Sequence, residues 1–249
     1  MGKALEEEDV RGFREETVRT GVRTVAIHGA YLINLGSTKE AIRTRSLYAL
    51  EDEASRAAML SVPYLVLHPG SSGEDPEEAG MARIASALRT FGRFPAGVTL
   101  LLENTAGQGN SLGRTMEQIR RLLDGAGAPS DVGVCLDSAH LFEAGYDISD
   151  QAAWENLLSE VERHAILPLV RMWHLNDSRT GFGSRVDRHF HIGEGEIGLD
   201  AFRRILTHRV FRELPMVLET PKNGEDDYEM DRRNLATLRM LAGSAESGE

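Results

Sequence analysis

Six apolar stretches recur along the chain, and each ends on a histidine or a carboxylate. They read RTVAIH, PYLVLH, VTLLLE, VGVCLD, VRMWH and PMVLE, and they end at His28, His68, Glu103, Asp137, His174 and Glu219. Continuous apolar runs of this length are typical of parallel strands that are buried on both faces. The pattern therefore predicts six parallel strands, each with a polar group at its carboxyl end.

The segments between these strands read as helices. We expect helices over residues 5–20, 37–60, 76–92, 114–125, 149–165, 199–208 and 226–242. Strands that alternate with helices at this spacing indicate an α/β fold with a parallel sheet. We expect a single TIM-type (β/α) barrel domain over residues 1–242. The small, polar end of the chain, residues 243–249, is predicted to be a disordered tail.

The number of strands departs from that of a complete barrel. A TIM barrel has eight strands, whereas the sequence shows six and opens with a helix. Either two strands are too degenerate to detect, or the chain begins partway through a barrel. The second case predicts an opened six-stranded sheet, with a gap between the strands that end at His28 and Glu219. Such a sheet has two exposed edges, which invite pairing or aggregation.

Composition and charge limit the cellular compartment and the classes of partner to be expected. Cys135 is the only cysteine and lies in an apolar run, so we expect no disulfide and a reducing, cytoplasmic location. No apolar run approaches the roughly 18 residues of a membrane span, so no membrane partner is expected. No obligate protein partner is evident either. The formal net charge of −11 disfavours nucleic acid, but bound divalent cations would reverse the local field.

Two further pairs of polar residues accompany the strand ends. Asp137 and His140 lie three residues apart at a strand-to-loop junction, and Asp187 and His189 would point to the same side of an extended segment. Each pair alone could equally form a hydrogen-bonded loop. Because all strand ends of a barrel open on one face, the pairs and the strand ends together make nine candidate ligands. Nine suit two or three ions, and zinc, manganese and iron all remain open.

Multinuclear sites of this type suit phosphodiester hydrolysis, because the metals activate water and neutralise charge on the leaving oxygen. They also suit sugar isomerisation, so the ligands alone do not fix the reaction. The stretch ENTAGQGNSLG contains the G-x-S-x-G pattern of a hydrolase nucleophile elbow. However, Ser111 follows Glu103 by eight residues, and an elbow requires the serine directly after a strand. A phosphate-binding loop or a structural turn explains this stretch better.

The sequence resembles the endonuclease IV family of DNA-repair enzymes, which incise DNA at abasic sites. The resemblance is carried, in family order, by HGAYLINLG (28–36), LHPGS (67–71), LLENTAGQG (101–109), VCLDSAHLFEAGYD (134–147), HLNDS (174–178), GSRVDRHFHIGEGEIG (183–198) and LET (218–220). It implies a barrel that here lacks its first two strands, the helix between them and a DNA-contacting loop with a minor-groove arginine. A start codon assigned too late, or a natural deletion, would each give such a chain.

The resemblance also implies three zinc ions, for which manganese or iron could substitute. The implied ligands of the three ions are, in turn, His28, His68 and Glu103; Glu103 as a bridge with Asp137, His174 and Glu219; and His140, Asp187 and His189. The implied reaction is hydrolysis of the phosphodiester 5′ to an abasic site in duplex DNA during base excision repair, with trimming of blocked 3′ ends. Glu219 and Glu103 would be its catalytic residues.

Five residues are candidate DNA contacts by the same resemblance. Tyr31 and Leu32 would fill the gap left when the abasic nucleotide turns into the pocket. Ordinary core packing of the segment AYLINL is the alternative. Arg179, Arg185 and Arg188 lie among the last ligands and would contact phosphates, although solvated loop charges would look the same.

Two other functions compete with the nuclease. A metal-dependent sugar isomerase or epimerase would use a similar barrel and similar ligands. An inactive, truncated relative would bind metal or DNA without turnover.

Overall fold

The computed structural model describes residues 3–128, 130–222, 226 and 228–243. Six parallel strands form one sheet in the order β1-β2-β3-β4-β5-β8. Their bounds are Ala26–His28 (β1), Tyr64–Leu67 (β2), Thr99–Glu103 (β3), Val132–Asp137 (β4), Val170–His174 (β5) and Met216–Val217 (β8). All six strands of the sequence pattern are therefore confirmed. Four end on the predicted polar residue, and the other two end within two residues of it.

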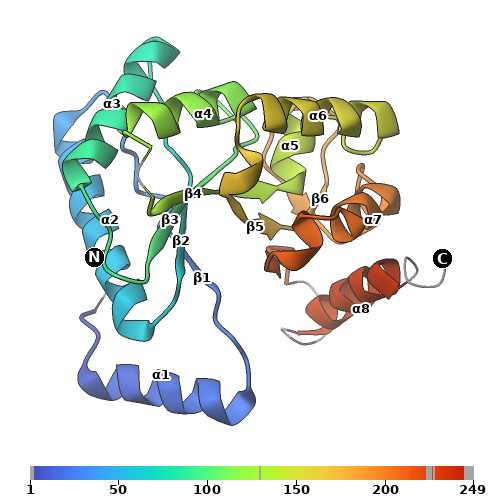
Figure 1. The fold of residues 1–249 in the computed structure, drawn as a ribbon, viewed down its shortest axis with the longest axis horizontal. Helices are drawn as coiled ribbons and strands as arrows, with labels where there is room; N and C mark the ends of the chain where they lie inside the picture. Colours follow the sequence, from blue (N-terminus) through green and yellow to red (C-terminus); the bar gives the residue numbers. More distant parts are fainter. Residues whose placement is uncertain (1–2, 129, 223–225, 227, 244–249) are drawn as a thin grey trace.

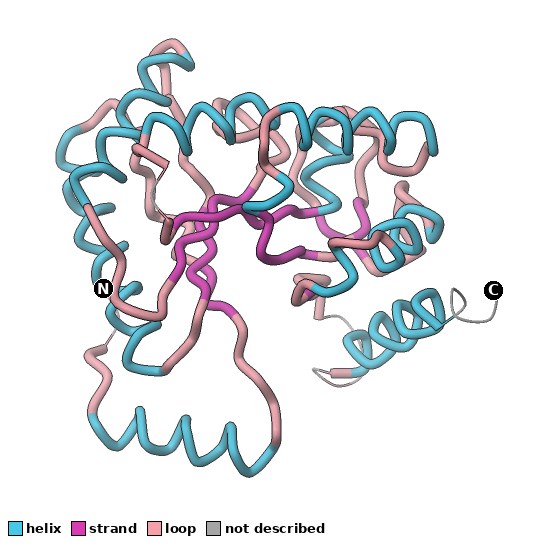
Figure 2. Tube along the Cα trace, viewed as in Figure 1, coloured by secondary structure: helices cyan, strands magenta, loops and turns pink. Residues whose placement is uncertain are grey.

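Helices surround the curled sheet on three sides, with the strands at the centre (Figures 1 and 2). They are α1 (Glu7–Thr20), α2 (Glu40–Leu60), α3 (Glu77–Phe91), α4 (Met116–Gly125), α5 (Ser138–Ala144), α6 (Gln151–Arg163), α7 (Leu199–Thr207) and α8 (Glu229–Gly243). Two 3₁₀ turns, Leu167–Leu169 and Phe211–Glu213, and a small antiparallel pair, β6 (Asp177–Ser178) with β7 (His189–Phe190), complete the fold. Helix α8 includes the first residue of the predicted tail, and residues 244–249 lie outside the described residues.

The sheet is an incomplete barrel. Strands β1 and β8 are its two ends, and among the described residues neither is paired on its outer side. The expected opening between the strands that lead to His28 and Glu219 is confirmed. Helix α1 lies apart from the strands (Figure 1), contacts α2 and has no buried residue. One link to the rest of the chain is the guanidinium of Arg14, which donates to the carbonyl of Met59 at 2.8 Å.

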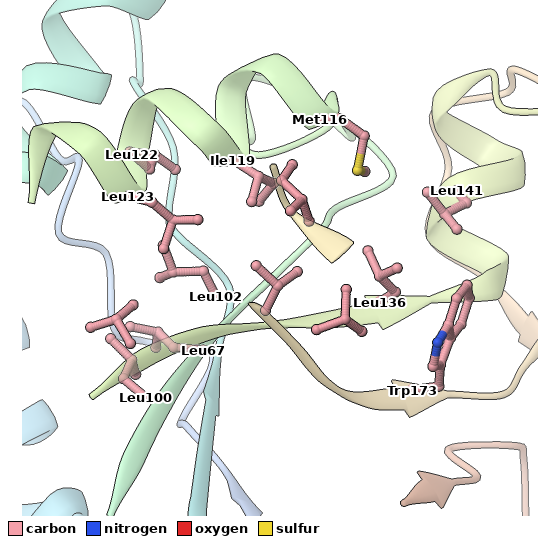
Figure 3. Close-up of a cluster of buried hydrophobic side chains, with 14 of the residues drawn as sticks. Leu67, Leu100, Leu102, Met116, Ile119, Leu122, Leu123, Leu136, Leu141 and Trp173 are labelled. Carbon is pink, nitrogen blue, oxygen red and sulfur yellow. The ribbon is translucent and has the colours of Figure 1, made fainter. Parts of the chain in front are cut away.

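The strands are apolar throughout because both of their faces are covered. Leu100 and Leu102 of β3 belong to the large core between sheet and helices, whereas Leu101 packs with Val66 and Met172 in a small cluster on the other face. Figure 3 shows the large core, where leucines of the strands meet the apolar side of α4. Alternating side chains therefore enter two different cores, which explains continuous apolar runs in place of an alternating pattern.

The junction after β4 differs from the prediction. In place of a loop, helix α5 begins directly after the strand, and Asp137 is its N-cap. The Asp137 carboxylate accepts a hydrogen bond from the backbone N–H of His140 at 2.8 Å. This bond satisfies one of the free N–H groups of a helix start. A capping carboxylate thus joins the strand to the helix without a connecting loop.

None of the helices in the described part of the chain is both long and apolar enough to cross a membrane.

The core assignment makes a prediction about stability. Leu102 is fully buried and Leu32 is 90% exposed, so the same truncation should have different costs at the two positions. We expect Leu102→Ala to lower the free energy of unfolding by about 2–5 kcal/mol, because it leaves a cavity. Leu32→Ala should change it by less than about 0.5 kcal/mol. Urea unfolding followed by circular dichroism measures both. Equal effects of the two truncations would show that the core is misassigned.

Candidate metal centre

A buried carboxylate lies at the carboxyl end of the sheet and contacts three imidazoles. Glu103, the last residue of β3, is fully buried. Its Oε2 lies 3.0 Å from Nε2 of His28 and 3.0 Å from Nε2 of His68. Its Oε1 lies 2.8 Å from Nδ1 of His174. The first predicted ligand group is therefore brought together, with ligand atoms that all lie within 4.8 Å of one another.

The second predicted group shares Glu103 with the first. Nδ1 of His174 lies 3.1 Å from Oε2 of Glu219 and 4.0 Å from Oδ2 of Asp137. These four side chains also offer ligand atoms within 4.8 Å of one another. One oxygen of Glu103 faces each group, so the two groups share this carboxylate.

The third predicted group lies on the other side of Asp137. Nε2 of His140 is 3.3 Å from Oδ2 of Asp187, and Nε2 of His189 is 3.6 Å from Oδ1 of Asp187. Asp137 itself forms a group with the two histidines. The resemblance implies Asp137 in the second group alone, whereas in the structure Asp137 belongs to the second group and also lies with His140 and His189. All nine predicted residues converge, and their role as ligands stays a prediction.

Three of the imidazoles are oriented by backbone carbonyl groups. Nδ1 of His28, of His140 and of His189 lies 2.8, 2.9 and 3.3 Å from a carbonyl oxygen. These oxygens belong to Gly29, Asn104 and Glu219. Because a carbonyl can only accept, Nδ1 carries the proton in each ring and Nε2 turns towards the acidic cluster. This is the arrangement of a metal-ligating histidine, whose outer nitrogen donates to a fixed acceptor.

Four carboxylates are packed together in this cluster, and the surroundings determine their charge. Burial raises the pKa of Glu103, but the imidazoles of His174 and His68 hold it well below its usual value. Burial lowers the pKa of His140, yet Asp137 and the other nearby carboxylates raise it to about 10. Glu103 therefore stays ionised and needs nearby positive charge. Divalent cations meet that need, so this donor set fits a metal cluster.

Two asparagines that the sequence analysis did not single out support the cluster. Asn176 donates from Nδ2 to Oδ2 of Asp137 at 2.6 Å, and its Oδ1 accepts from the backbone N–H of Glu219 at 2.7 Å. Oδ1 of Asn104 accepts from the backbone N–H of Asp137 at 2.7 Å. Asn104 directly follows a predicted ligand in the sequence, and Asn176 follows one by two positions. Their place just after a strand end was the available signal.

The sequence analysis also did not place Cys135 next to the candidate ligands. Its thiol lies within 4.8 Å of ligand atoms of Glu103 and His174, in a fully buried group. Burial raises the pKa of this thiol to about 12, so at neutral pH it is a protonated neighbour of the cluster. Cys135 precedes Asp137 by two positions in β4, and residues two apart in a strand share a face. That spacing could have predicted its position.

Tyr31 and Leu32 project from the turn that follows β1. Their exposed fractions are 82% and 90%, so the alternative of core packing is wrong for these two residues. It holds for Ile33 and Leu35, which are buried. The Tyr31 ring lies 5.7 Å from the ring of His28, between centroids. An exposed aromatic and an exposed leucine therefore lie beside the first ligand group.

The three arginines lie on an exposed loop between β6 and β7. Arg179, Arg185 and Arg188 are all exposed. The guanidinium carbon of Arg179 is 5.7 Å from the centroid of the Phe190 ring. Arg188 donates from Nη1 to the backbone carbonyl of Asp187 at 2.6 Å. The loop thus presents positive side chains next to the third ligand group.

Ser111 does not occupy a nucleophile elbow. It lies between β3 and α4 and forms an isolated antiparallel bridge with Ser71. A cavity of about 230 Å³ beside the first ligand group is lined by both serines together with Tyr31, Asn34 and His68. The glycine-rich stretch therefore forms a turn at the edge of the site. This agrees with the sequence analysis, which disfavoured a nucleophile elbow at Ser111.

Comparison with known proteins places this chain in a family. A family model described as "Xylose isomerase-like TIM barrel" matches residues 1–238. The Chloroflexus aurantiacus protein named "Probable endonuclease 4" is 46% identical over 246 residues, which cover 98% of this chain and 86% of that protein. The crystal structure of endonuclease IV from Thermus thermophilus superposes with a TM-score of 0.80 and 34% identity, over 96% of this chain and 85% of that one.

A structure of L-ribulose 3-epimerase matches 98% of this chain and 83% of its own, with a TM-score of 0.74 and 17% identity. A likeness at that identity shows the fold alone. The relatives at 34–46% identity extend along nearly the whole chain. The chain therefore belongs to the endonuclease IV family, whose fold is the xylose isomerase-like TIM barrel.

Proposed function

We propose that this chain is a zinc-dependent endonuclease that hydrolyses the phosphodiester 5′ to an abasic site in duplex DNA and trims blocked 3′ ends. One observation carries the proposal. Nine histidine and carboxylate side chains from separate parts of the chain meet in three overlapping groups, next to two exposed apolar side chains. Family membership supports the nuclease reaction over others that use the same fold.

The residues would hold three ions in the predicted sets. The sets are His28, His68 and Glu103; Glu103, Asp137, His174 and Glu219; and His140, Asp187 and His189, with Asp137 beside the last set. Imidazole and carboxylate donors suit zinc, and they also accept manganese or iron. When bound, such ions lower the pKa of water and stabilise negative charge on a phosphate and its leaving oxygen.

The two glutamates take different roles because they differ in exposure. The Glu219 side chain is 27% exposed, so it can reach a substrate at the mouth. Burial raises its pKa, but the hydrogen bond from His174 lowers it below the usual value. Glu219 therefore stays ionised and can orient a water molecule towards the phosphorus and accept its proton. Glu103 is fully buried, so its contribution is to hold ions.

The exposed turn after β1 favours a large substrate. Tyr31 and Leu32 extend into solvent, where an apolar wedge can enter a base stack from which a nucleotide has turned out. A small sugar is instead held in an enclosed pocket. Arg179, Arg185 and Arg188 would contact the DNA backbone near the third group. This rim therefore favours duplex DNA over the ketose of an isomerase.

The first prediction concerns the reaction itself. His68→Ala removes one ligand of the first group, so incision of a duplex with a single abasic site should fall at least about 100-fold, the scale of a lost catalytic contribution. His164→Ala, at the end of helix α6, is the matched control and should retain activity. Product strands are resolved by denaturing electrophoresis. Turnover of a candidate ketose in a parallel reaction would favour the isomerase, and no activity towards either substrate would favour an inactive relative.

The second prediction concerns the wedge. Tyr31→Ala and Leu32→Ala should each lower kcat/KM on abasic duplex. The expected loss of transition-state stabilisation is about 1–3 kcal/mol, the scale of one lost base-stacking contact. Hydrolysis of a small phosphodiester, which needs no wedge, should not change. Tyr48→Ala is the control, because Tyr48 is 61% exposed but lies on α2. Equal losses on both substrates would mean that these residues act on the metal site and not on DNA.

The third prediction concerns protons. Neighbouring carboxylates raise the pKa of His140 to about 10 despite burial, so at pH 7 both of its nitrogens carry protons. Metal ligands must be deprotonated. Zinc binding to the metal-free protein should therefore release protons, and its affinity should rise as the pH increases from 6 towards about 10. Calorimetry in two buffers of different ionisation enthalpy measures the release. Identical enthalpies in both buffers would contradict this expectation.

A further inference from the structure

The loop between β6 and β7 carries one predicted ligand and leads directly into another. Asp187 lies near its end, and His189 begins β7. Most of its residues are exposed, so packing of its own side chains does little to fix its shape. A loop of this kind needs an anchor if it is to hold two ligands at fixed positions, because ordering a chain segment costs entropy at each residue.

Glu143 is placed to provide that anchor. It lies on α5, one turn after His140, and its side chain is fully buried. Its Oε1 accepts hydrogen bonds from Oγ of Ser178 at 2.6 Å, from Oγ1 of Thr180 at 3.3 Å and from the backbone N–H of Arg188 at 3.1 Å. One carboxylate oxygen therefore joins the first residues of the loop to its last.

The backbone of the same helix turn adds two further bonds. The carbonyl of Phe142 accepts from the N–H of Gly183 at 3.1 Å, and the carbonyl of Glu143 accepts from the N–H of Arg185 at 3.0 Å. The bond to Arg188 matters most for the site, since Arg188 lies between the two ligands in the sequence. Fixing its N–H fixes the direction in which the chain passes from Asp187 to His189.

Burying a carboxylate at this position lowers the stability of the protein, and the fold does not require a carboxylate there. Oε2 of Glu143 has no hydrogen-bond partner among the described residues, and a buried polar atom without a partner destabilises the protein. An apolar side chain would fill the same space without that cost. The three bonds at Oε1 are what a carboxylate adds, and all three go to the segment that carries the third ligand group.

We propose that Glu143 is a positioning residue that fixes residues 178–188 so that Asp187 and His189 can bind the third ion. This inference rests on the proposed function, because it assumes the third metal site. Glu143 is not one of the nine predicted ligands, and because its side chain is buried it does not contact the DNA. It acts through the loop, and the property it needs is an acceptor oxygen at the Oε1 position.

The test counts metal ions. The wild-type chain, Glu143→Gln and Glu143→Ala are each loaded with zinc, passed over a desalting column and analysed for zinc per folded chain. We expect three ions in the wild type. We also expect three in Glu143→Gln, whose amide oxygen can still accept, and two in Glu143→Ala. Competition with a chelator should show a loss of about 10–100-fold in affinity for one ion, the scale of a lost outer-shell partner.

The control is Glu160→Ala. Glu160 accepts from the hydroxyl of Tyr146 at 2.9 Å, but it lies on α6, away from the loop. This variant should keep three ions. Circular dichroism shows whether each variant is folded. If Glu143→Ala does not fold, Ser178→Ala removes one of the three donors and should weaken the binding of one zinc by about tenfold, roughly the value of one hydrogen bond to a charged group.

The outcomes separate this inference from the function on which it rests. Three ions in both the wild type and Glu143→Ala, with unchanged affinity, would overturn the role of Glu143 and leave the metal site standing. Fewer than three ions in the wild type would overturn the third site itself and the inference with it. Loss of one ion in Glu143→Gln as well as in Glu143→Ala would show that the carboxylate charge acts, and not the acceptor position.

Discussion

The rest of the site is arranged around the contacts between the buried carboxylate of Glu103 and three imidazoles. An ionised group with no exposure is tolerated only where opposite charge and hydrogen bonds surround it. Three imidazoles, one each from the ends of β1, β2 and β5, lie within 3.0 Å of its oxygens. The strand ends are staggered. Glu103 pairs with Cys135, and Asp137, two residues further along β4, pairs with His174. An offset of two residues keeps the side chains on the same face of the sheet.

The opening of the barrel does not separate the cluster. His28 comes from β1 and Glu219 from just beyond β8, which are the two ends of the sheet. Both nevertheless reach the same cluster, since Glu103 shares one group with His28 and another with Glu219. Each strand is held by its neighbour and by the helices outside it. The first two groups therefore form at the ends of the strands without a closed ring, whereas His140 comes from α5, Asp187 comes from the segment that leads into β7, and His189 begins β7.

The choice among reactions lies in the loops. The same fold appears in a sugar epimerase with 17% identity, so the barrel alone does not fix the chemistry. Here the turn after β1 exposes Tyr31 and Leu32, and the loop between β6 and β7 presents arginines. These positive side chains lie beside an acidic cluster in a chain of net charge −11. Bound cations would reverse the field at the mouth, which would reconcile an acidic protein with the proposed DNA substrate.

The sequence alone determined the six strands, their polar ends and the nine converging residues. A continuous apolar run is a local signal for a buried strand. The polar residue that follows it marks the carboxyl end of that strand, and in a barrel all these ends open on one face. Contacts between distant segments were decided by the tertiary structure. Helix α5 follows β4 directly because Asp137 caps it, and Asp137 faces two ligand groups because α5 turns His140 back towards it.

Glu143 shows the same limit of sequence reasoning. Nothing near it in the sequence indicates that its carboxylate accepts a hydrogen bond from the backbone N–H of Arg188, 45 residues away. The sequence pattern did not indicate helix α5 itself. Packing of α5 against the loop between β6 and β7 brings the two together, and that packing depends on the whole sheet. The sequence specifies which side chains are available for the proposed site, whereas the folded chain specifies which of them lie close together and share hydrogen-bond partners.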